Sequence, residues 1–92
     1  MEMFVFTGII MQEDGGFGAL CPELDVASQG SSVEEARAML LEAATLHLEG
    51  AFEDGLPYLR PVPSSEDPRQ TQAASVVDVF RFKVDVAIRP YA

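Results

Sequence analysis

The chain has 92 residues, 48% of them hydrophobic, which is enough for one small globular domain. Its 15 acidic residues against 6 basic ones give a formal net charge of −9. Such a surface repels phosphate backbones and attracts basic partners, so direct binding to nucleic acid is not expected. Solubility alone would also account for the charge, and both explanations stay open.

Cysteine content and hydropathy argue against a disulfide-bonded, membrane-spanning or secreted protein. Cys21 is the single cysteine, so no disulfide can form within the chain. No apolar run approaches the roughly 20 residues of a membrane-spanning helix. The first residues also lack the charged region and the cleavage site of a signal peptide. We therefore expect a cytoplasmic protein that makes no membrane contact.

The first third of the chain predicts three strands. Met3–Gln12 reads MFVFTGIIMQ, with β-branched and aromatic residues on both alternating faces, which predicts an interior strand. The turn residues Glu13–Gly16 predict a hairpin into a second strand at Phe17–Cys21. A short third strand is expected at Val26–Ser28, and Gly30 interrupts it.

A long helix is predicted next. Ser32 and Glu35 have the spacing of a capping box, in which each side chain bonds the backbone of the other residue. The helix should run to about Asp54 and stop at Gly55. The face that should lie on the sheet has helical spacing and consists of Val33, Ala36, Leu40, Ala43, Ala44, His47 and Ala51.

The same helix carries a second apolar stripe, made of Leu41, Leu48 and Phe52. Two interpretations carry equal weight. The termini and the proline-rich connector could cover the stripe, or it could be the contact surface of a homodimer or homotetramer. We take these three residues as the candidate oligomer contact.

Residues 56–75 form a connector with four prolines, which predicts a loop. A closing strand is predicted at residues 76–89, where apolar and polar residues alternate from Phe80 to Arg89. Val77 and Val79 have the opposite parity, which indicates a bulge near Val79. The resulting order β-β-β-α-β predicts one α+β domain over residues 1–92, an antiparallel sheet with one helix packed on one face.

No residue pattern indicates catalysis. His47 lies on the core-facing side of the helix, where a single histidine is usually packed and hydrogen-bonded. Cys21 precedes a proline and has acidic neighbours, which do not activate a thiol. The acidic pairs fall in turns, caps or loops, where carboxylates have ordinary local roles. We expect no enzyme activity, no metal site and no cofactor.

Five short motifs, taken in order, carry a resemblance to a known family. They are Asp14-Gly15-Gly16-Phe17, Cys21-Pro22-Glu23-Leu24, Ser28-Gln29-Gly30, Ser32-Val33-Glu34-Glu35-Ala36 and Glu53-Asp54-Gly55-Leu56-Pro57. Together they resemble the HicB-like antitoxins over about residues 4–60, with the closing strand placed as that family expects. No single motif is specific, because each is a common hairpin, turn or cap.

The resemblance implies a truncated ribonuclease-H-like fold without the catalytic carboxylates of ribonuclease H enzymes. It also implies a protein partner: family members typically neutralise HicA toxin, a small basic ribonuclease, by covering its active face, and often form dimers or tetramers. Many members add a C-terminal DNA-binding domain. This chain ends at Ala92, directly after the closing strand, so promoter binding is not expected of it.

The charge and the turn positions select the candidate residues for partner binding, which are Glu13, Asp14, Glu23 and Asp25. The leading hypothesis is an antitoxin-like module that inhibits a basic ribonuclease. An orphan homo-oligomeric scaffold or regulator without a toxin is the main alternative. A remnant metal-dependent nuclease is the third and rests on fold analogy alone.

Overall fold

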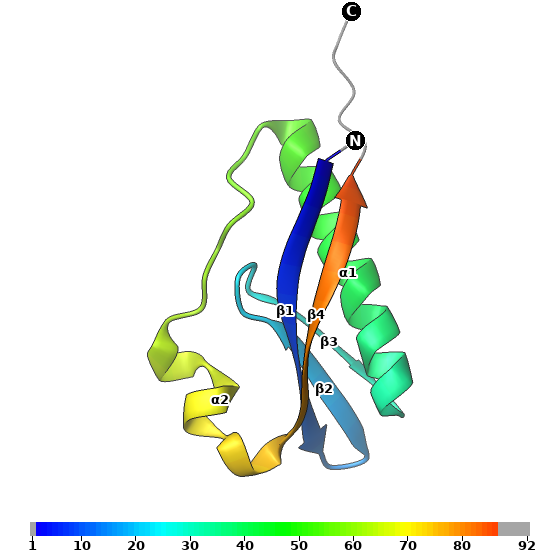
Figure 1. Ribbon diagram of the computed structural model, residues 1–92, viewed down its shortest axis with the longest axis vertical. Coiled ribbons are helices and arrows are strands. Elements are labelled where there is room, and N and C mark those ends of the chain that lie inside the picture. Colours follow the sequence, from blue (N-terminus) through cyan, green and yellow to red (C-terminus); the bar gives the residue numbers. More distant parts are fainter. Residues whose placement is uncertain (1, 87–92) are drawn as a thin grey trace, which may run out of the picture.

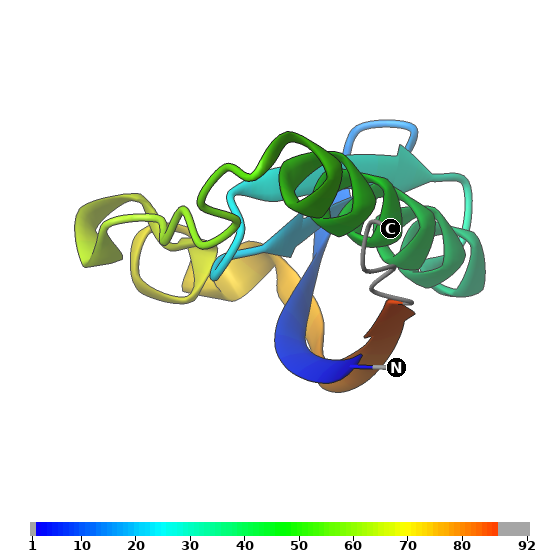
Figure 2. The same cartoon turned by 90° about the horizontal axis from the view of Figure 1, so that it is seen from above.

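The computed structural model describes residues 2–86, and the side chains of residues 4–84. Within this range one antiparallel sheet has the strand order β3-β2-β1-β4, with a long helix across one face (Figures 1 and 2). The elements are β1 (Glu2–Glu13), β2 (Gly16–Cys21), β3 (Val26–Gly30), α1 (Val33–Asp54), α2 (Pro68–Thr71) and β4 (Val76–Val86). The predicted α+β class and the order β-β-β-α-β are confirmed. The predicted end of the closing strand, residues 87–89, lies outside the described residues.

β1 is an interior strand, as predicted, and six consecutive residues from Phe6 to Met11 are buried. It pairs with β4 along nearly its whole length, but with β2 only from Ile9 to Glu13. A glycine weakens a strand interior because it has no side chain to pack. The ring of Phe80 on β4 packs over Gly8 and fills the place of the absent side chain. A Cβ atom on Gly8 would lie only 2.3 Å from this ring.

The ends of α1 are set by local chemistry. The Ser32 hydroxyl accepts a hydrogen bond from the Glu35 amide at 3.0 Å, as a capping residue does. The Glu35 carboxylate accepts a hydrogen bond from the Ser31 amide at 2.8 Å. The predicted capping box would instead use the amide of Ser32, one residue later. Gly55 has φ +67°, and the Leu56 amide donates to the Ala51 carbonyl at 2.8 Å, which ends the helix at the predicted place.

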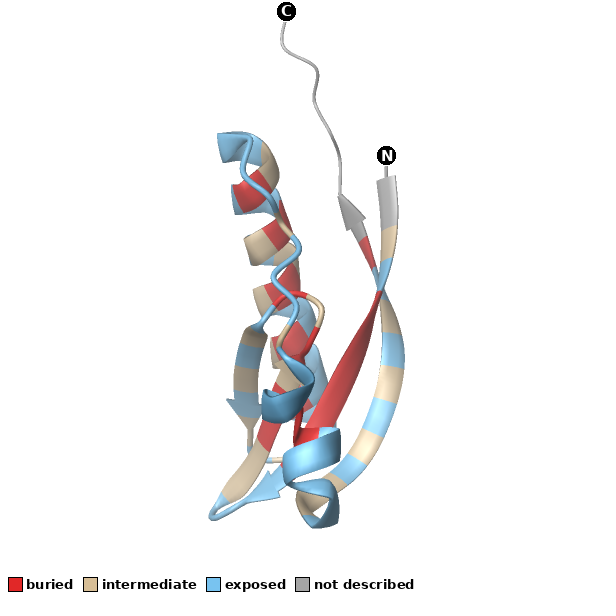
Figure 3. Ribbon diagram, turned by 90° about the vertical axis from the view of Figure 1, so that its left-hand side faces the viewer, coloured by how far each residue is buried: buried red, intermediate tan, exposed pale blue. Residues whose placement is uncertain are grey.

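The core lies between α1 and the helix-facing side of the sheet, where the buried stripe of α1 faces the strands (Figure 3). The buried residues of α1 are Ala36, Leu40, Ala44, Leu48 and Ala51. Phe6, Ile10 and Val84 face them from the sheet. The predicted face is confirmed at most positions, but Leu48 belongs to it and His47 is only partly buried.

The three residues of the second stripe differ in how far they are buried. Leu48 is 0% exposed, and Phe52 packs its ring 5.1 Å from Tyr58 and 5.5 Å from Phe4. Leu48 is therefore a core residue, which corrects its assignment to an oligomer contact. Phe52 is partly buried against Tyr58 and Phe4, and its assignment to an oligomer contact stays a prediction. Leu41 is 42% exposed, and its role as an oligomer contact stays a prediction.

The connector is more ordered than the predicted loop. It contains α2 and two 3₁₀ turns, at Ser64–Glu66 and Ala73–Ser75. Asp67 caps α2, accepting from the Arg69 amide at 2.8 Å and pairing with its guanidinium at 2.7 Å. These hydrogen bonds from Arg69 lower the pKa of Asp67. The signal for α2 was in the sequence, because Asp followed by Pro is a strong helix start.

The bulge in β4 lies two residues before the predicted position. Asp78 pairs with Ile10 and Val76 pairs with Met11, so Val77 is the extra residue. Asp78 thereby faces the helix, where its carboxylate pairs with Arg37 of α1 at 2.9 Å. Val79 then falls on the outer face of the sheet, where it is 47% exposed.

Two glycine substitutions should change stability in opposite directions. A Cβ atom on Gly30 would lie 2.5 Å from the backbone nitrogen of Ala36, and backbone cannot move aside, so Gly30→Ala should destabilise by about 1–3 kcal/mol. Gly50 is exposed within α1 and has open space around it, so Gly50→Ala should stabilise by about 1 kcal/mol. Urea unfolding of both variants checks this. Unchanged or higher stability of Gly30→Ala would contradict the close approach of β3 to α1, and destabilisation by Gly50→Ala would contradict the open space around Gly50.

Candidate functional site

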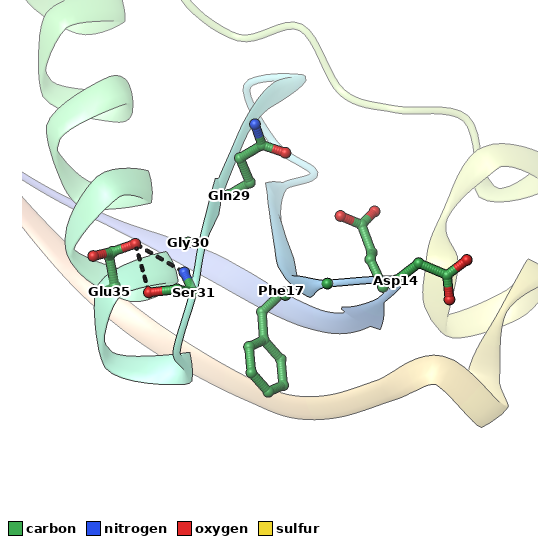
Figure 4. A pocket seen from close by; sticks show the side chains of 9 residues that line it. Asp14, Phe17, Gln29, Gly30, Ser31 and Glu35 are labelled. Carbon is green, nitrogen blue, oxygen red and sulfur yellow. Dashed lines mark hydrogen bonds between the residues drawn. The ribbon is translucent and has the colours of Figure 1, made fainter.

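A groove of about 370 Å³ lies at one end of the sheet, where the β1–β2 turn, the end of β3 and the start of α1 meet. Its lining residues are Glu13, Asp14, Gly15, Gly16, Phe17, Gln29, Gly30, Ser31 and Glu35. Figure 4 shows Asp14 and Glu35 at its two sides, with Gly30, Ser31 and Phe17 between them.

Glycines let the three segments meet. Gly15 has φ +82°, a left-handed conformation that closes the hairpin after Asp14. A Cβ atom on Gly16 would lie 2.8 Å from the carbonyl oxygen of Gly30, so the hairpin approaches β3 closely. Gly30 in turn lies against the first turn of α1. The shape of the groove therefore depends on residues without side chains.

The groove is acidic. Its lining contains the carboxylates of Glu13, Asp14 and Glu35 and no basic residue. Glu13 and Asp14 are exposed, whereas Glu35 is held by the Ser31 amide at 2.8 Å and the Ser31 hydroxyl at 3.2 Å. Such a surface suits a cationic side chain of another protein, since arginine and lysine pair with carboxylates.

Glu23 has a structural role that sequence reasoning missed. β1 pairs with β2 only from Ile9 onward. Before Ile9, the Glu23 carboxylate bonds the edge of β1 in place of a neighbouring strand. It accepts from the Thr7 amide at 3.0 Å and from the Thr7 hydroxyl at 2.7 Å. The Glu23 carbonyl also accepts from the Arg60 amide at 3.0 Å, which fastens the connector. No local pattern signals these contacts, because the partners are far apart in sequence.

Cys21 and His47 are both engaged in the interior. Cys21 is 0% exposed, and burial together with the nearby Glu23 carboxylate raises its pKa to about 12, so the thiol stays protonated at neutral pH. The Nε2 atom of His47 lies 2.8 Å from the Tyr58 carbonyl oxygen, which confirms the predicted packed and hydrogen-bonded histidine. Among the described side chains, no group of three or more His, Cys, Asp or Glu is arranged to hold a metal ion.

Comparison with known proteins identifies the family. No family model matches the chain. UPF0150 protein ssl0738 from Synechocystis sp. (strain ATCC 27184 / PCC 6803 / Kazusa) is 47% identical over 49 residues, which span 49% of this chain and 68% of that protein. The chain belongs to the UPF0150 family, which is HicB-like.

The fold of this UPF0150 chain also has a solved counterpart. A chain from the structure of a HicA3 and HicB3 toxin-antitoxin complex superimposes with a TM-score of 0.59 and 19% sequence identity. The match covers 91% of this chain and 99% of that chain. The four-stranded antiparallel sheet with one long helix is therefore the HicB-like fold that the sequence motifs predicted.

In this UPF0150 chain the four candidate acids do not form one site. Glu13 and Asp14 lie at the β1–β2 turn and line the groove. Glu23 and Asp25 lie in the β2–β3 turn, which is at the other end of β2 (Figure 1). Glu35, which sequence reasoning assigned to capping alone, joins Glu13 and Asp14 instead. Their assignment to partner binding stays a prediction.

From residue 2 to residue 86, no helix combines the length and the apolar character that crossing a bilayer requires.

Proposed function

We propose that this UPF0150 chain is an antitoxin-like protein-binding module, which neutralises a small basic HicA-type ribonuclease by covering its RNA-binding face. The acidic groove carries the proposal, because carboxylates from the hairpin turn and from α1 line one concave surface without a basic residue. Membership of a HicB-like family and the likeness to a chain from a toxin-antitoxin complex support it.

The physical basis is charge mimicry. A ribonuclease binds RNA phosphates with a positively charged face, and a module with a net charge of −9 is attracted to that face from a distance. Glu13 and Asp14 are exposed and free to pair with its cations, while Ser31 holds Glu35 in place. Contact at the groove would then exclude RNA by occupying the same cations.

The proposal assigns no enzymatic activity to the chain. The side chains that most often act in catalysis have interior roles, His47 with the Tyr58 carbonyl and Cys21 as a protonated thiol. Such an interaction would take place in the cytoplasm, where messenger RNA is cleaved.

The test is inhibition of RNA cleavage by a purified HicA-type ribonuclease from the same genome. Reversing the groove charges with Glu13→Lys and Asp14→Lys together should weaken binding roughly a hundredfold, because two attractive contacts become repulsive. Glu42→Lys with Glu49→Lys is the matched control: it makes the same change in net charge at exposed positions of α1, away from the groove lining. Calorimetry gives the affinities, and cleavage of a labelled RNA gives the inhibition.

Three outcomes distinguish binding through the groove, binding through net charge alone and a scaffold without a toxin partner. Loss of affinity in the groove variant alone supports the proposal. Equal loss in both variants would show that net charge acts without the groove. Absence of any inhibition by the unmodified protein, with a defined oligomer in solution, would favour the orphan homo-oligomeric scaffold. The exposed Leu41 and Leu46 of α1 could serve the contacts of such an oligomer.

A further inference from the structure

β4 presents a long unpaired edge. Within residues 2–86 it is the last strand of the sheet and pairs with β1 on one side only. It extends over 11 residues and contains no proline, so its backbone could pair with another strand along its length. In Figure 3 it carries alternating exposed and partly buried residues beside the buried middle of β1.

The direction of its backbone groups follows from one hydrogen bond. The Thr7 amide donates to Glu23, on the side of β1 away from β4, so Thr7 and its partner Arg81 do not exchange hydrogen bonds. The N–H and C=O groups of Arg81 therefore point away from β1. Those of Val79 and Lys83, two residues to either side, point the same way. These three residues form the free edge.

The free edge is positively charged in an acidic protein. Arg81 and Lys83 are exposed on the outer face of the sheet, beside Val79, which is 47% exposed. On the helix-facing side, the Arg37 guanidinium lies 4.4 Å from the centre of the Phe80 ring. Arg37 also pairs with Asp78 of β4 at 2.9 Å, so Arg81 and Lys83 supply the positive charge of the free edge.

We propose that the free edge of β4 binds an extended acidic segment of a partner protein, which adds to the sheet as a fifth strand. The partner's backbone pairs with Val79, Arg81 and Lys83. Its carboxylates alternate along the strand and lie beside Arg81 and Lys83 on the outer face. Its apolar side chains lie on the other face, beside the partly buried Phe80 and Phe82.

Charge selects this occupant over two others. A second β4 strand, added antiparallel in the register centred on Phe82, would bring Arg81 opposite Lys83 of the other copy, and like charges on neighbouring strands repel. A nucleic acid would meet the same cations, but its bases and phosphates do not match the alternating N–H and C=O groups of a strand edge. An acidic strand satisfies both the backbone and the side chains.

The test uses the full chain and two labelled decapeptides, one of alternating valine and glutamate and one of alternating valine and lysine. Fluorescence anisotropy should show the glutamate peptide binding at least about tenfold more tightly. Arg81→Glu with Lys83→Glu should reverse that preference. Val79→Pro keeps the charge but removes one outward N–H, so it should weaken binding of the glutamate peptide about tenfold. Amide chemical shifts should change at Val79, Arg81 and Lys83.

Other results would overturn the proposal. Shift changes that the glutamate peptide produces only outside β4, with none at Val79, Arg81 and Lys83, would show that no strand adds at this edge. Tighter binding of a short single-stranded RNA would assign the cations to nucleic acid. Circular dichroism shows whether the Val79→Pro protein is folded, and the double charge variant tests the edge if it is not. The groove variant Glu13→Lys with Asp14→Lys should still prefer the glutamate peptide, so this test is independent of the proposed antitoxin role.

Discussion

Leu48→Ala is expected to lower the free energy of unfolding by about 2–5 kcal/mol. Leu48 is 0% exposed at the centre of the α1 face that contacts the sheet, so truncation leaves a cavity that the surrounding side chains cannot fill. A domain of this size has about 5–15 kcal/mol of stability in total, so the loss should be visible as a large fall in the urea midpoint. Chemical denaturation followed by circular dichroism measures it.

Leu46→Ala is the matched control, with the same residue change in the same helix. Leu46 is 61% exposed, so its truncation should alter stability by no more than about 0.5 kcal/mol. A loss below about 1 kcal/mol for Leu48→Ala would place Leu48 outside the core. If Leu48→Ala instead dissociated an oligomer without unfolding the chain, the contact role assigned to it from sequence would return.

Glu23→Ala is expected to cost about 2–4 kcal/mol. It leaves the amide and the hydroxyl of Thr7 without their acceptor, and Thr7 is only 7% exposed, so the loss of both hydrogen bonds carries a desolvation cost. The pKa of the Cys21 thiol should also fall, because the Glu23 charge helps to raise it. Urea unfolding gives the first effect. The rate at which a disulfide reagent modifies Cys21, measured against pH, gives the second.

Glu23→Gln separates the hydrogen bonds from the charge. The amide oxygen still accepts from the Thr7 amide, and the amide nitrogen can donate to the Thr7 hydroxyl. Most of the stability should therefore remain, while the pKa of Cys21 still falls. Glu34→Ala, at an exposed position in the first turn of α1, should have a much smaller effect than Glu23→Ala. A change below about 0.5 kcal/mol for Glu23→Ala would contradict the bridging role.

Helix ends and tight turns were predictable from the sequence, because they depend on residues that are close together in the chain. The spacing of Ser32 and Glu35 marked the start of α1, and Gly55 marked its end, because caps act within one turn of the helix. The hairpin after Glu13 followed from turn residues in the same way. Asp67 and Pro68 carried an equally local signal for α2, which the expectation of a loop overlooked.

The candidate site was only partly predictable. Glu13 and Asp14 were selected for their charge and turn position, and they line the groove. Glu35 was missed because its capping role explained it fully from the sequence. Glu23 has the same charge as Glu13, and only its contact with Thr7, 16 residues away, shows that it holds the sheet together. Charge and turn position cannot distinguish an exposed acid from one that is held by another strand.

The sequence by itself determined the order of strands and helix, the ends of α1 and the acidity of the surface, because these depend on composition or on residues within one turn or hairpin of each other. Only the tertiary structure decided that Leu48 is buried while Leu46 is exposed, that Glu23 serves the interior, and that Glu35 joins Glu13 and Asp14. The physical reason is distance along the chain. Such contacts arise when strands and helix pack together, and the surface of α1 that meets the sheet depends on that packing as well as on its own periodicity.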